Sequence, residues 1–144
     1  MNDQAQAELK KIFNGRFSTS ESTRANYARG EDTYDPVLSK AVVFPETNEE
    51  VSKILTLCNK HKIPVVPFGT GTSLEGNVVG NDKGITISLE KMNKILSVNA
   101  LDFDCRVQAC VTKEQLNEYL RAVSYTHLRA HETGRNLVCR LLLE

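Results

Sequence analysis

The stretch Pro64-Val65-Val66-Pro67-Phe68-Gly69-Thr70-Gly71-Thr72-Ser73-Leu74-Glu75-Gly76-Asn77 places three glycines and three hydroxyl side chains directly after a short apolar run. Glycine lets backbone N–H groups approach an anion in conformations that a Cβ atom would forbid, and hydroxyl groups add further donors. The stretch therefore predicts a strand followed by a loop that holds phosphate. The first hypothesis for the ligand of this loop is a nucleotide cofactor.

Two common phosphate-binding loops and a loop without a ligand are the alternatives. A Walker A loop carries Lys and then Ser or Thr after its second glycine, whereas Gly71 and Gly76 are followed by Thr72 and Asn77. A Rossmann loop needs a third glycine where this chain has Leu74, and it opens a helix. The glycines that follow the loop would each cost about 1 kcal/mol inside a helix, which disfavours that arrangement. A glycine-rich hairpin that binds nothing stays open as the third alternative.

The residues before the loop predict a strand, a helix and a second strand. Residues 40–44 form a short apolar run that ends at a proline, which is typical of a strand. A helix then begins after Thr47, because Thr47 and Glu50 have the spacing of a capping box, and it must end before residue 64. The predicted buried stripe of this helix consists of Val51, Ile54, Leu55 and Cys58. With residues 63–68 as the second strand, the unit is βαβ, and its second strand delivers the loop at its carboxyl end, where open sheets bind ligands.

The remaining elements are assigned by the same signals. Residues 3–13 predict a helix and residues 14–40 a polar, irregular segment, and residues 85–89, 95–98 and 103–111 predict three further strands. A last helix follows Thr112, which forms a capping box with Gln115, and its apolar stripe is Leu116, Tyr119 and Leu120. Stripes of this kind usually pack on a core. The sequence therefore predicts an α+β fold.

Four segments around the loop resemble the PCMH-type FAD-binding domain of the vanillyl-alcohol oxidase-like flavoproteins. They are residues 29–32 (Arg-Gly-Glu-Asp), 41–45 (Ala-Val-Val-Phe-Pro), 51–58 and 67–77. The resemblance covers roughly residues 24–122 and is closest to the branch of (R)-2-hydroxyacid dehydrogenases that includes cytochrome-linked D-lactate dehydrogenases and the D subunit of glycolate oxidase. It implies the N-terminal part of such a domain, truncated, with FAD as cofactor. The residues that match the family's loop, and are thereby expected to contact the cofactor on its pyrophosphate side, are Pro67, Gly69, Thr70, Gly71, Thr72, Ser73, Gly76 and Asn77.

The resemblance also implies an oxidoreductase in which the flavin accepts hydride from a small D-lactate-like 2-hydroxy acid and passes electrons to an acceptor. In such a family the catalytic histidine and the arginines that bind the substrate carboxylate belong to a downstream substrate domain. We therefore expect no catalytic residue in this chain, and we expect the chain alone to be inactive. The alternatives are a glycolate or D-2-hydroxyglutarate dehydrogenase of the same family and a non-catalytic nucleotide-binding module.

Composition limits the partners. A chain of 144 residues with 40% hydrophobic residues can bury one core. Its formal net charge of zero provides no electrostatic reason to expect nucleic acid or an anionic membrane as a partner. The sequence has no run of about 18 apolar residues and begins with neither a signal peptide nor a transit peptide. We therefore expect a cytoplasmic protein without a membrane span.

The cysteines and one histidine are expected to be structural. The four cysteines form no Cys-x-x-Cys pair and lie in apolar sequence contexts, which favours reduced thiols: Cys58, Cys105, Cys110 and Cys139. Cys110 stands where the family has a glycine before its Val-Thr pair, and the resemblance implies that the site either tolerates a small thiol there or binds FAD less well. His61 is expected to be a solvated partner at the end of a helix.

The resemblance ends after Ala122. The family would continue with a glycine-rich segment on the adenine side of FAD, whereas residues 123–144 resemble the translation of a sequencing adapter, and we expect no structural role for them. Within them, His127 and His131 with Glu132 and Cys139 imitate a zinc site, but the glutamate lies outside the histidine pair and no capped helix precedes it, so we expect no metal. The expected organisation is an N-terminal helix and irregular segment (1–40), a partial FAD-binding domain (41–122) and a non-native tail (123–144).

Overall fold

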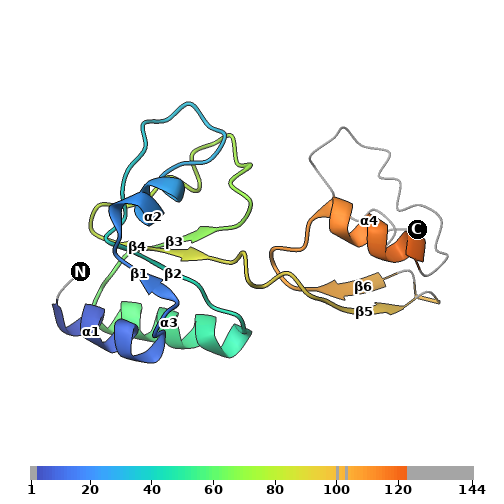
Figure 1. Ribbon diagram of the computed structural model, residues 1–144, viewed down its shortest axis with the longest axis horizontal. Helices are drawn as coiled ribbons and strands as arrows, with labels where there is room; N and C mark the ends of the chain where they lie inside the picture. The colour runs from blue at the N-terminus through green and yellow to red at the C-terminus, as the bar shows by residue number, and fades with distance from the viewer. Residues whose placement is uncertain (1–2, 100, 103, 123–144) are drawn as a thin grey trace. The chain divides into compact units, whose positions relative to one another are not determined.

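A computed structural model of the chain describes residues 3–99, 101–102 and 104–122. The chain divides into two units, Met1–Asn93 and Lys94–Glu144. The first unit contains a four-stranded sheet with helices on both faces, and in the second unit the described residues form a two-stranded sheet and one helix (Figure 1). Helices combined with both parallel and antiparallel strand pairs confirm the predicted α+β class.

The sheet of the first unit has the strand order β1-β2-β4-β3. Its strands are β1 (Phe17–Ser18), β2 (Ala41–Val43), β3 (Val65–Phe68) and β4 (Ile85–Ser88). β1 runs antiparallel to β2, whereas β2 and β3 both pair in parallel with β4, which lies between them. The predicted βαβ unit is therefore present with one strand inserted at its centre. The carboxyl ends of the three parallel strands meet at one edge of the sheet.

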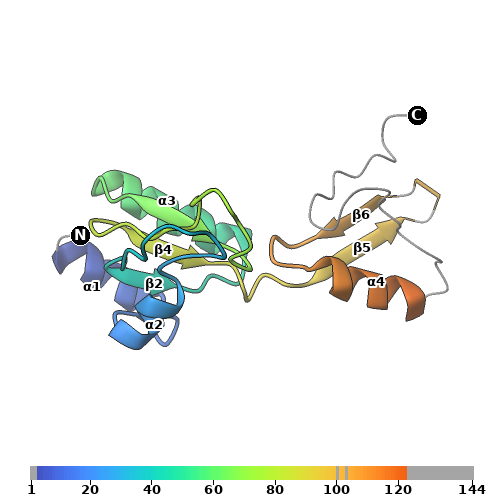
Figure 2. The ribbon, with the colours of Figure 1, turned by 90° about the horizontal axis from the view of Figure 1, so that it is seen from above.

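Two helices cover one face of this sheet and a third lies on the other. α1 (Asp3–Ile12) and α3 (Asn48–Lys60) pack side by side on one face, while α2 (Glu21–Asn26) and the segment after it lie on the opposite face (Figures 1 and 2). The core fills the space between α1, α3 and the sheet. Its buried side chains are Ala5, Leu9, Phe13, Ala41, Val43, Ile54, Cys58, Ile63, Ile85 and Ile87.

The start of α3 confirms the predicted cap, and its buried face corrects the predicted stripe. The Thr47 hydroxyl accepts a hydrogen bond from the Glu50 N–H at 3.3 Å. Ile54 and Cys58 are buried as predicted, but Leu55 is 47% exposed and Leu57 packs against the core instead. Positions 54, 57 and 58 are three and four residues apart and thus share one side of the helix, whereas position 55 is turned away from it.

The prediction of an irregular segment from residue 14 to residue 40 is wrong in part, because it contains β1 and α2. β1 has only two residues, and its partner β2 lies more than 20 residues further along the chain. Next to it the Arg16 guanidinium donates two hydrogen bonds to the Glu50 carboxylate, at 2.6 and 2.7 Å. The pairing of β1 with β2 and the contact of Arg16 with Glu50 both depend on residues far away in the chain. No local sequence pattern therefore predicts this strand.

The described residues of the second unit form β5 (Ile95–Asn99), β6 (Asp104–Val107) and α4 (Lys113–Ala122). β5 and β6 form an antiparallel pair with a register irregularity between Ile95 and Ser97. β6 ends at Val107 instead of continuing to residue 111, because the chain turns there, with the Val111 N–H donating to the Gln108 carbonyl at 3.2 Å. The predicted cap of α4 is confirmed, since the Thr112 hydroxyl accepts from the Gln115 N–H at 3.2 Å.

Candidate cofactor site

The glycine-rich loop leaves the sheet at the carboxyl end of β3. Residues 69–84, which connect β3 to β4, contain no helix. This contradicts the Rossmann alternative, in which a helix follows the loop directly. Figure 1 shows the loop as a green trace on the α2 side of the sheet. β3 is an edge strand, where Pro67 with its missing N–H is tolerated.

Two glycines of the loop are required by its own conformation. Gly71 has φ +75°, and a Cβ atom there would lie 2.9 Å from the Phe68 ring. Gly76 has φ +70°, and a Cβ atom there would lie 2.8 Å from the Tyr34 ring. Gly69 differs from both, because its φ is not positive and a Cβ atom would meet nothing within 4 Å. The backbone at the start of the loop is therefore open to a ligand.

The polar side chains predicted to contact the cofactor lie together on this loop. The hydroxyl oxygens of Thr70 and Thr72 are 3.4 Å apart, and the Asn77 amide donates to the Ser73 hydroxyl at 3.2 Å. Thr70, Thr72 and Asn77 are exposed, and Ser73 is half-buried. Hydroxyl and amide groups that are accessible beside an open backbone suit the phosphate oxygens of a nucleotide. The predicted contacts of this loop with phosphate stay a prediction, and the accessible groups of the loop are of the kind that such contacts need.

A second segment, residues 28–34, packs against the loop, and sequence reasoning missed its role. The Glu31 N–H donates to the Gly71 carbonyl at 2.8 Å, and the Gly80 N–H donates to the Ala28 carbonyl at 3.0 Å. A Cβ atom on Gly30 would lie only 2.4 Å from the Gly71 carbonyl oxygen, so only glycine fits this approach.

This segment is itself held in a tight turn. The buried Asp32 carboxylate accepts hydrogen bonds from the N–H groups of Gly30 at 3.2 Å and Tyr34 at 3.1 Å. An aspartate that bonds to the backbone two residues away is a turn signal visible in the sequence. Asp32 together with Gly30 would therefore have indicated a tight turn from the sequence. The contact of Gly30 with Gly71 could not have been predicted in this way.

An aromatic cluster lies beneath the loop at the ends of the parallel strands. The Tyr27 ring packs edge-on against Phe68 and Phe44, with ring centroids 5.1 and 5.6 Å apart. The Tyr27 hydroxyl donates to the Glu90 carboxylate at 2.7 Å. Phe44, Phe68 and Glu90 lie at or just beyond the carboxyl ends of β2, β3 and β4, so Tyr27 connects all three strand ends. Because Phe68 also faces Gly71, this cluster supports the shape of the loop.

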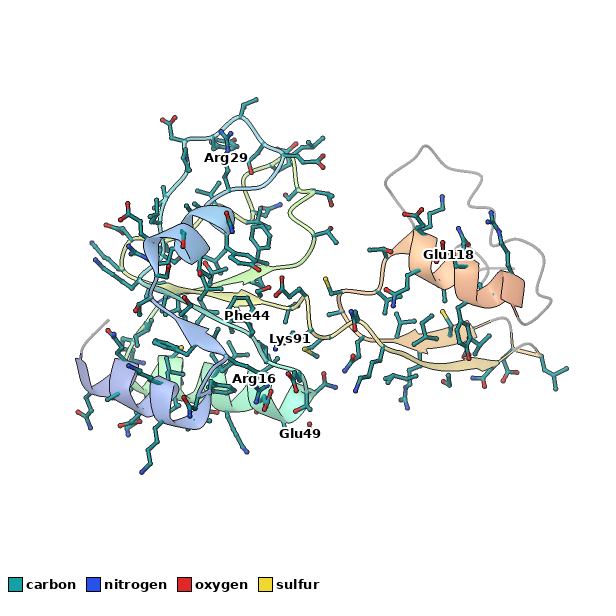
Figure 3. All side chains as sticks on the ribbon, in the orientation of Figure 1. Arg16, Arg29, Phe44, Glu49, Lys91 and Glu118 are labelled. Carbon is teal, nitrogen blue, oxygen red and sulfur yellow. The ribbon has the colours of Figure 1, made fainter. Side chains whose placement is uncertain are left out.

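A charged cluster lies at the start of α3, formed by Arg16, Glu46, Glu50 and Lys91. The bidentate contact with Arg16 lowers the pKa of Glu50 to about 2. The Lys91 ammonium lies 3.4 Å from the Glu46 carboxylate. Figure 3 labels Arg16 and Lys91, and the pairing of these cations with glutamates leaves neither of them directed at the glycine loop.

The thiols and the histidine lie outside the loop. Cys58 is buried, which raises its pKa to about 11, and so it is not a nucleophile at neutral pH. Cys105 is exposed and Cys110 is half-buried, and the three described cysteines form no disulfide, as predicted. The prediction of a solvated His61 is wrong, because its side chain is 9% exposed and faces the Glu8 carboxylate of α1 at 3.7 Å. α1 packs on α3, which removes this helix end from water.

No metal site is found in the described part of the chain, where no three His, Cys, Asp or Glu side chains gather. The histidine pair His127 and His131, with Glu132 and Cys139, lies outside the described residues, as does the whole predicted tail. None of the helices that the structure describes is long and apolar enough to cross a membrane.

The fold and the loop define a nucleotide-binding flavoprotein domain, and comparison with known families agrees. The sequence model of the FAD binding domain family matches residues 39–131. The chain therefore belongs to the FAD binding domain family, which confirms the predicted cofactor, FAD. It also confirms the resemblance to FAD-linked oxidoreductases on which that prediction depends.

The curated relatives that the chain resembles include D-lactate dehydrogenases and a glycolate oxidase subunit. The chain is 38% identical over 104 residues to a probable mitochondrial D-lactate dehydrogenase of Danio rerio, covering 72% of this chain and 21% of the relative. It is 36% identical over 128 residues to mitochondrial D-lactate dehydrogenase [cytochrome] 1 of Saccharomyces cerevisiae, covering 82% and 22%. With glycolate oxidase subunit GlcD of Bacillus subtilis it shares 32% over 92 residues, covering 64% and 20%. The chain thus spans about a fifth of the length of these relatives.

Solved structures show the same fold at low sequence identity. Alkyldihydroxyacetonephosphate synthase superimposes with a TM-score of 0.77 at 20% identity, over 85% of this chain and 27% of the other. p-Cresol methylhydroxylase with substrate bound superimposes with a TM-score of 0.68 at 19% identity, over 84% and 24%. Both similarities support the α+β fold.

Proposed function

We propose that the chain is the diphosphate-binding part of an FAD-dependent (R)-2-hydroxyacid dehydrogenase that oxidises D-lactate-like substrates. The observation that carries the proposal is the loop after β3, which combines an open backbone at Gly69 with accessible hydroxyl groups. The residues proposed to contact the cofactor are Pro67, Gly69, Thr70, Gly71, Thr72, Ser73, Gly76 and Asn77.

In this proposal some residues of the loop maintain its conformation and others donate hydrogen bonds to the cofactor. Gly71 and Gly76 hold the loop in its conformation against Phe68 and Tyr34. The backbone near Gly69 and the hydroxyls of Thr70 and Thr72 provide hydrogen-bond donors to phosphate oxygens. FAD, when bound, supplies the acceptor for the hydride of the substrate. None of the described side chains is proposed to be catalytic.

Relatives named for D-lactate, one of them also named for a cytochrome, support D-lactate as substrate and a cytochrome as electron acceptor of the whole protein. Oxidation of glycolate or D-2-hydroxyglutarate is the alternative, supported by relatives with those names. A nucleotide-binding module without catalysis is the alternative from another class. A cytoplasmic location stays a prediction from the sequence, and two relatives carry the word mitochondrial in their names.

FAD titration of the chain, followed by flavin fluorescence, tests the proposal with two glycine variants. Gly69→Ala leaves packing unchanged but places a methyl group where phosphate would approach, so we expect at least a tenfold weaker affinity at unchanged urea stability. Gly15→Ala is the control, because Gly15 has φ +76° and no neighbour within 4 Å of its Cβ position. It is expected to cost about 1 kcal/mol of stability and leave FAD affinity unchanged. Equal FAD affinity of Gly69→Ala and the unaltered chain would contradict the site.

A further inference from the structure

We infer that Arg29 provides the positive charge that pairs with the cofactor diphosphate, an inference that rests on the proposed function. The glycine loop contains no cation, because Glu75 is its only charged side chain between residues 64 and 77. A diphosphate carries negative charge, and a cationic side chain adds charge pairing to the hydrogen bonds that it donates to phosphate oxygens. Within this chain, a cation beside the diphosphate would come from a segment that reaches the loop.

Arg29 belongs to a segment that packs against the loop backbone. The Cα atom of Gly30 lies 3.8 Å from the position of a Cβ atom on Gly71. Arg29 directly precedes Gly30, and consecutive Cα atoms are about 3.8 Å apart. The Arg29 side chain therefore leaves the backbone one residue away from the contact between Gly30 and Gly71.

Contacts on both sides of the loop hold this segment in place. The Glu31 N–H donates to the Gly71 carbonyl at 2.8 Å, and the Tyr34 ring packs where Gly76 leaves space. Between these two contacts, the buried Asp32 carboxylate fixes the turn. Arg29 therefore lies in a segment that hydrogen bonds hold beside the loop. Figure 3 shows it on the segment that follows α2.

The other cations of the first unit are engaged or placed elsewhere. Four of them belong to α1 and α3, which cover the face of the sheet opposite to α2 (Figure 1): Lys10, Lys11, Lys53 and Lys60. Arg16 is paired with Glu50, Lys91 with Glu46, and Arg24 donates to the Ser39 carbonyl. Lys40, Lys62 and Lys83 precede the amino ends of β2, β3 and β4, at the edge of the sheet opposite to the start of the loop.

Arg29, by contrast, is exposed and makes no ion pair or hydrogen bond within the part of the chain that the structure describes. The exposed carboxylates of Glu31 and Glu75 lie in the same two segments and would repel a phosphate that had no cation beside it. Arginine suits this position because its planar guanidinium binds two phosphate oxygens at once.

FAD titrations of four forms of the chain test this role: the unaltered chain, Arg29→Gln, Arg29→Lys and Lys40→Gln. We expect Arg29→Gln to raise the Kd for FAD about 10- to 100-fold, the range for loss of a charged hydrogen bond. Arg29→Lys retains part of the affinity, because it keeps the charge but loses the bidentate geometry. Lys40→Gln removes the same charge at the opposite edge of the sheet and is expected to change Kd less than twofold.

Salt provides a second readout, since added NaCl is expected to weaken FAD binding more steeply in the unaltered chain than in Arg29→Gln. Equal affinities of Arg29→Gln and the unaltered chain overturn the role of Arg29 and leave the proposed function in place. An equal loss in Lys40→Gln also overturns it, because the effect is then one of net charge alone. Failure of the unaltered chain to bind FAD overturns the proposed function itself, and the role of Arg29 with it. Equal urea midpoints of the four forms show that the comparison concerns binding rather than folding.

Discussion

Replacing Glu50 by glutamine should destabilise the first unit strongly at neutral pH. The Glu50 carboxylate accepts two hydrogen bonds from Arg16, at 2.6 and 2.7 Å, and one from the Glu46 N–H at 2.7 Å. The side chains of Arg16 and Glu50 are 24% and 22% exposed, so water screens their contact only in part. Glu50 also lies in the first turn of α3, where a negative charge is favourable.

The magnitude follows from the pKa of Glu50. A fall from 4.5 to about 2 on folding corresponds, at about 1.4 kcal/mol per pKa unit, to roughly 3 kcal/mol of stability. Because the pKa is lower in the folded state, this stability is complete above pH 4.5 and is lost as the pH falls from about 4.5 toward 2. At pH 3 less than about half of it remains.

Urea unfolding followed by circular dichroism at pH 7 and pH 3 measures this effect. We expect Glu50→Gln to lose roughly 3 kcal/mol at pH 7 and markedly less at pH 3. Lys60→Gln is the control, because the Lys60 ammonium is 3.8 Å from the Glu8 carboxylate and its side chain is 61% exposed. An exposed pair of this kind contributes about 0.5 kcal/mol. A loss below about 1 kcal/mol for Glu50→Gln at pH 7, or an equal loss at both pH values, would refute this reasoning.

Three further predictions concern the loop, the substrate and the tail. Gly71→Val should lower stability by about 1–3 kcal/mol and abolish flavin binding, because Gly71 has φ +75° and faces Phe68; a yellow, normally stable variant would contradict the loop assignment. In a longer protein that contains this chain, D-lactate should reduce the flavin anaerobically faster than L-lactate, and equal or inverted preference would count against the branch of D-lactate dehydrogenases. Deletion of residues 123–144 should change the free energy of unfolding by less than about 0.5 kcal/mol, and a loss above about 2 kcal/mol would show that these residues are an evolved part of the fold.

Several features of the site were predictable because their signals are local. The caps formed by Thr47 and Thr112 each need only a hydroxyl and an N–H three residues later, and both are present. The glycine loop was located for the same reason, since Gly71 and Gly76 need positive φ whatever surrounds them. Resemblance to a family then added FAD, which the residues alone left open among several nucleotide-binding loops.

Other predictions failed where a residue's surroundings come from distant parts of the chain. His61 ends α3 as a sequence pattern suggests, but α1 packs on α3 and places Glu8 against its side chain. Leu55 has the spacing of a buried residue, yet the direction from which the sheet meets α3 leaves it exposed and buries Leu57. Which side of an amphipathic helix meets the core depends on that packing.

The sequence by itself determined β3, the glycine-rich loop after it and the capped helices α3 and α4. Turns, caps and glycine conformations depend on neighbours within a few residues. Only the tertiary structure decided that β4 lies between β2 and β3, that Tyr27 joins the three strand ends, and that Gly30 lies against Gly71. Gly30 and Gly71 are about 40 residues apart in the chain, and their contact requires the sheet order to bring two loops to the same place. The second segment of the candidate cofactor site, with Arg29 on it, is therefore a product of the fold.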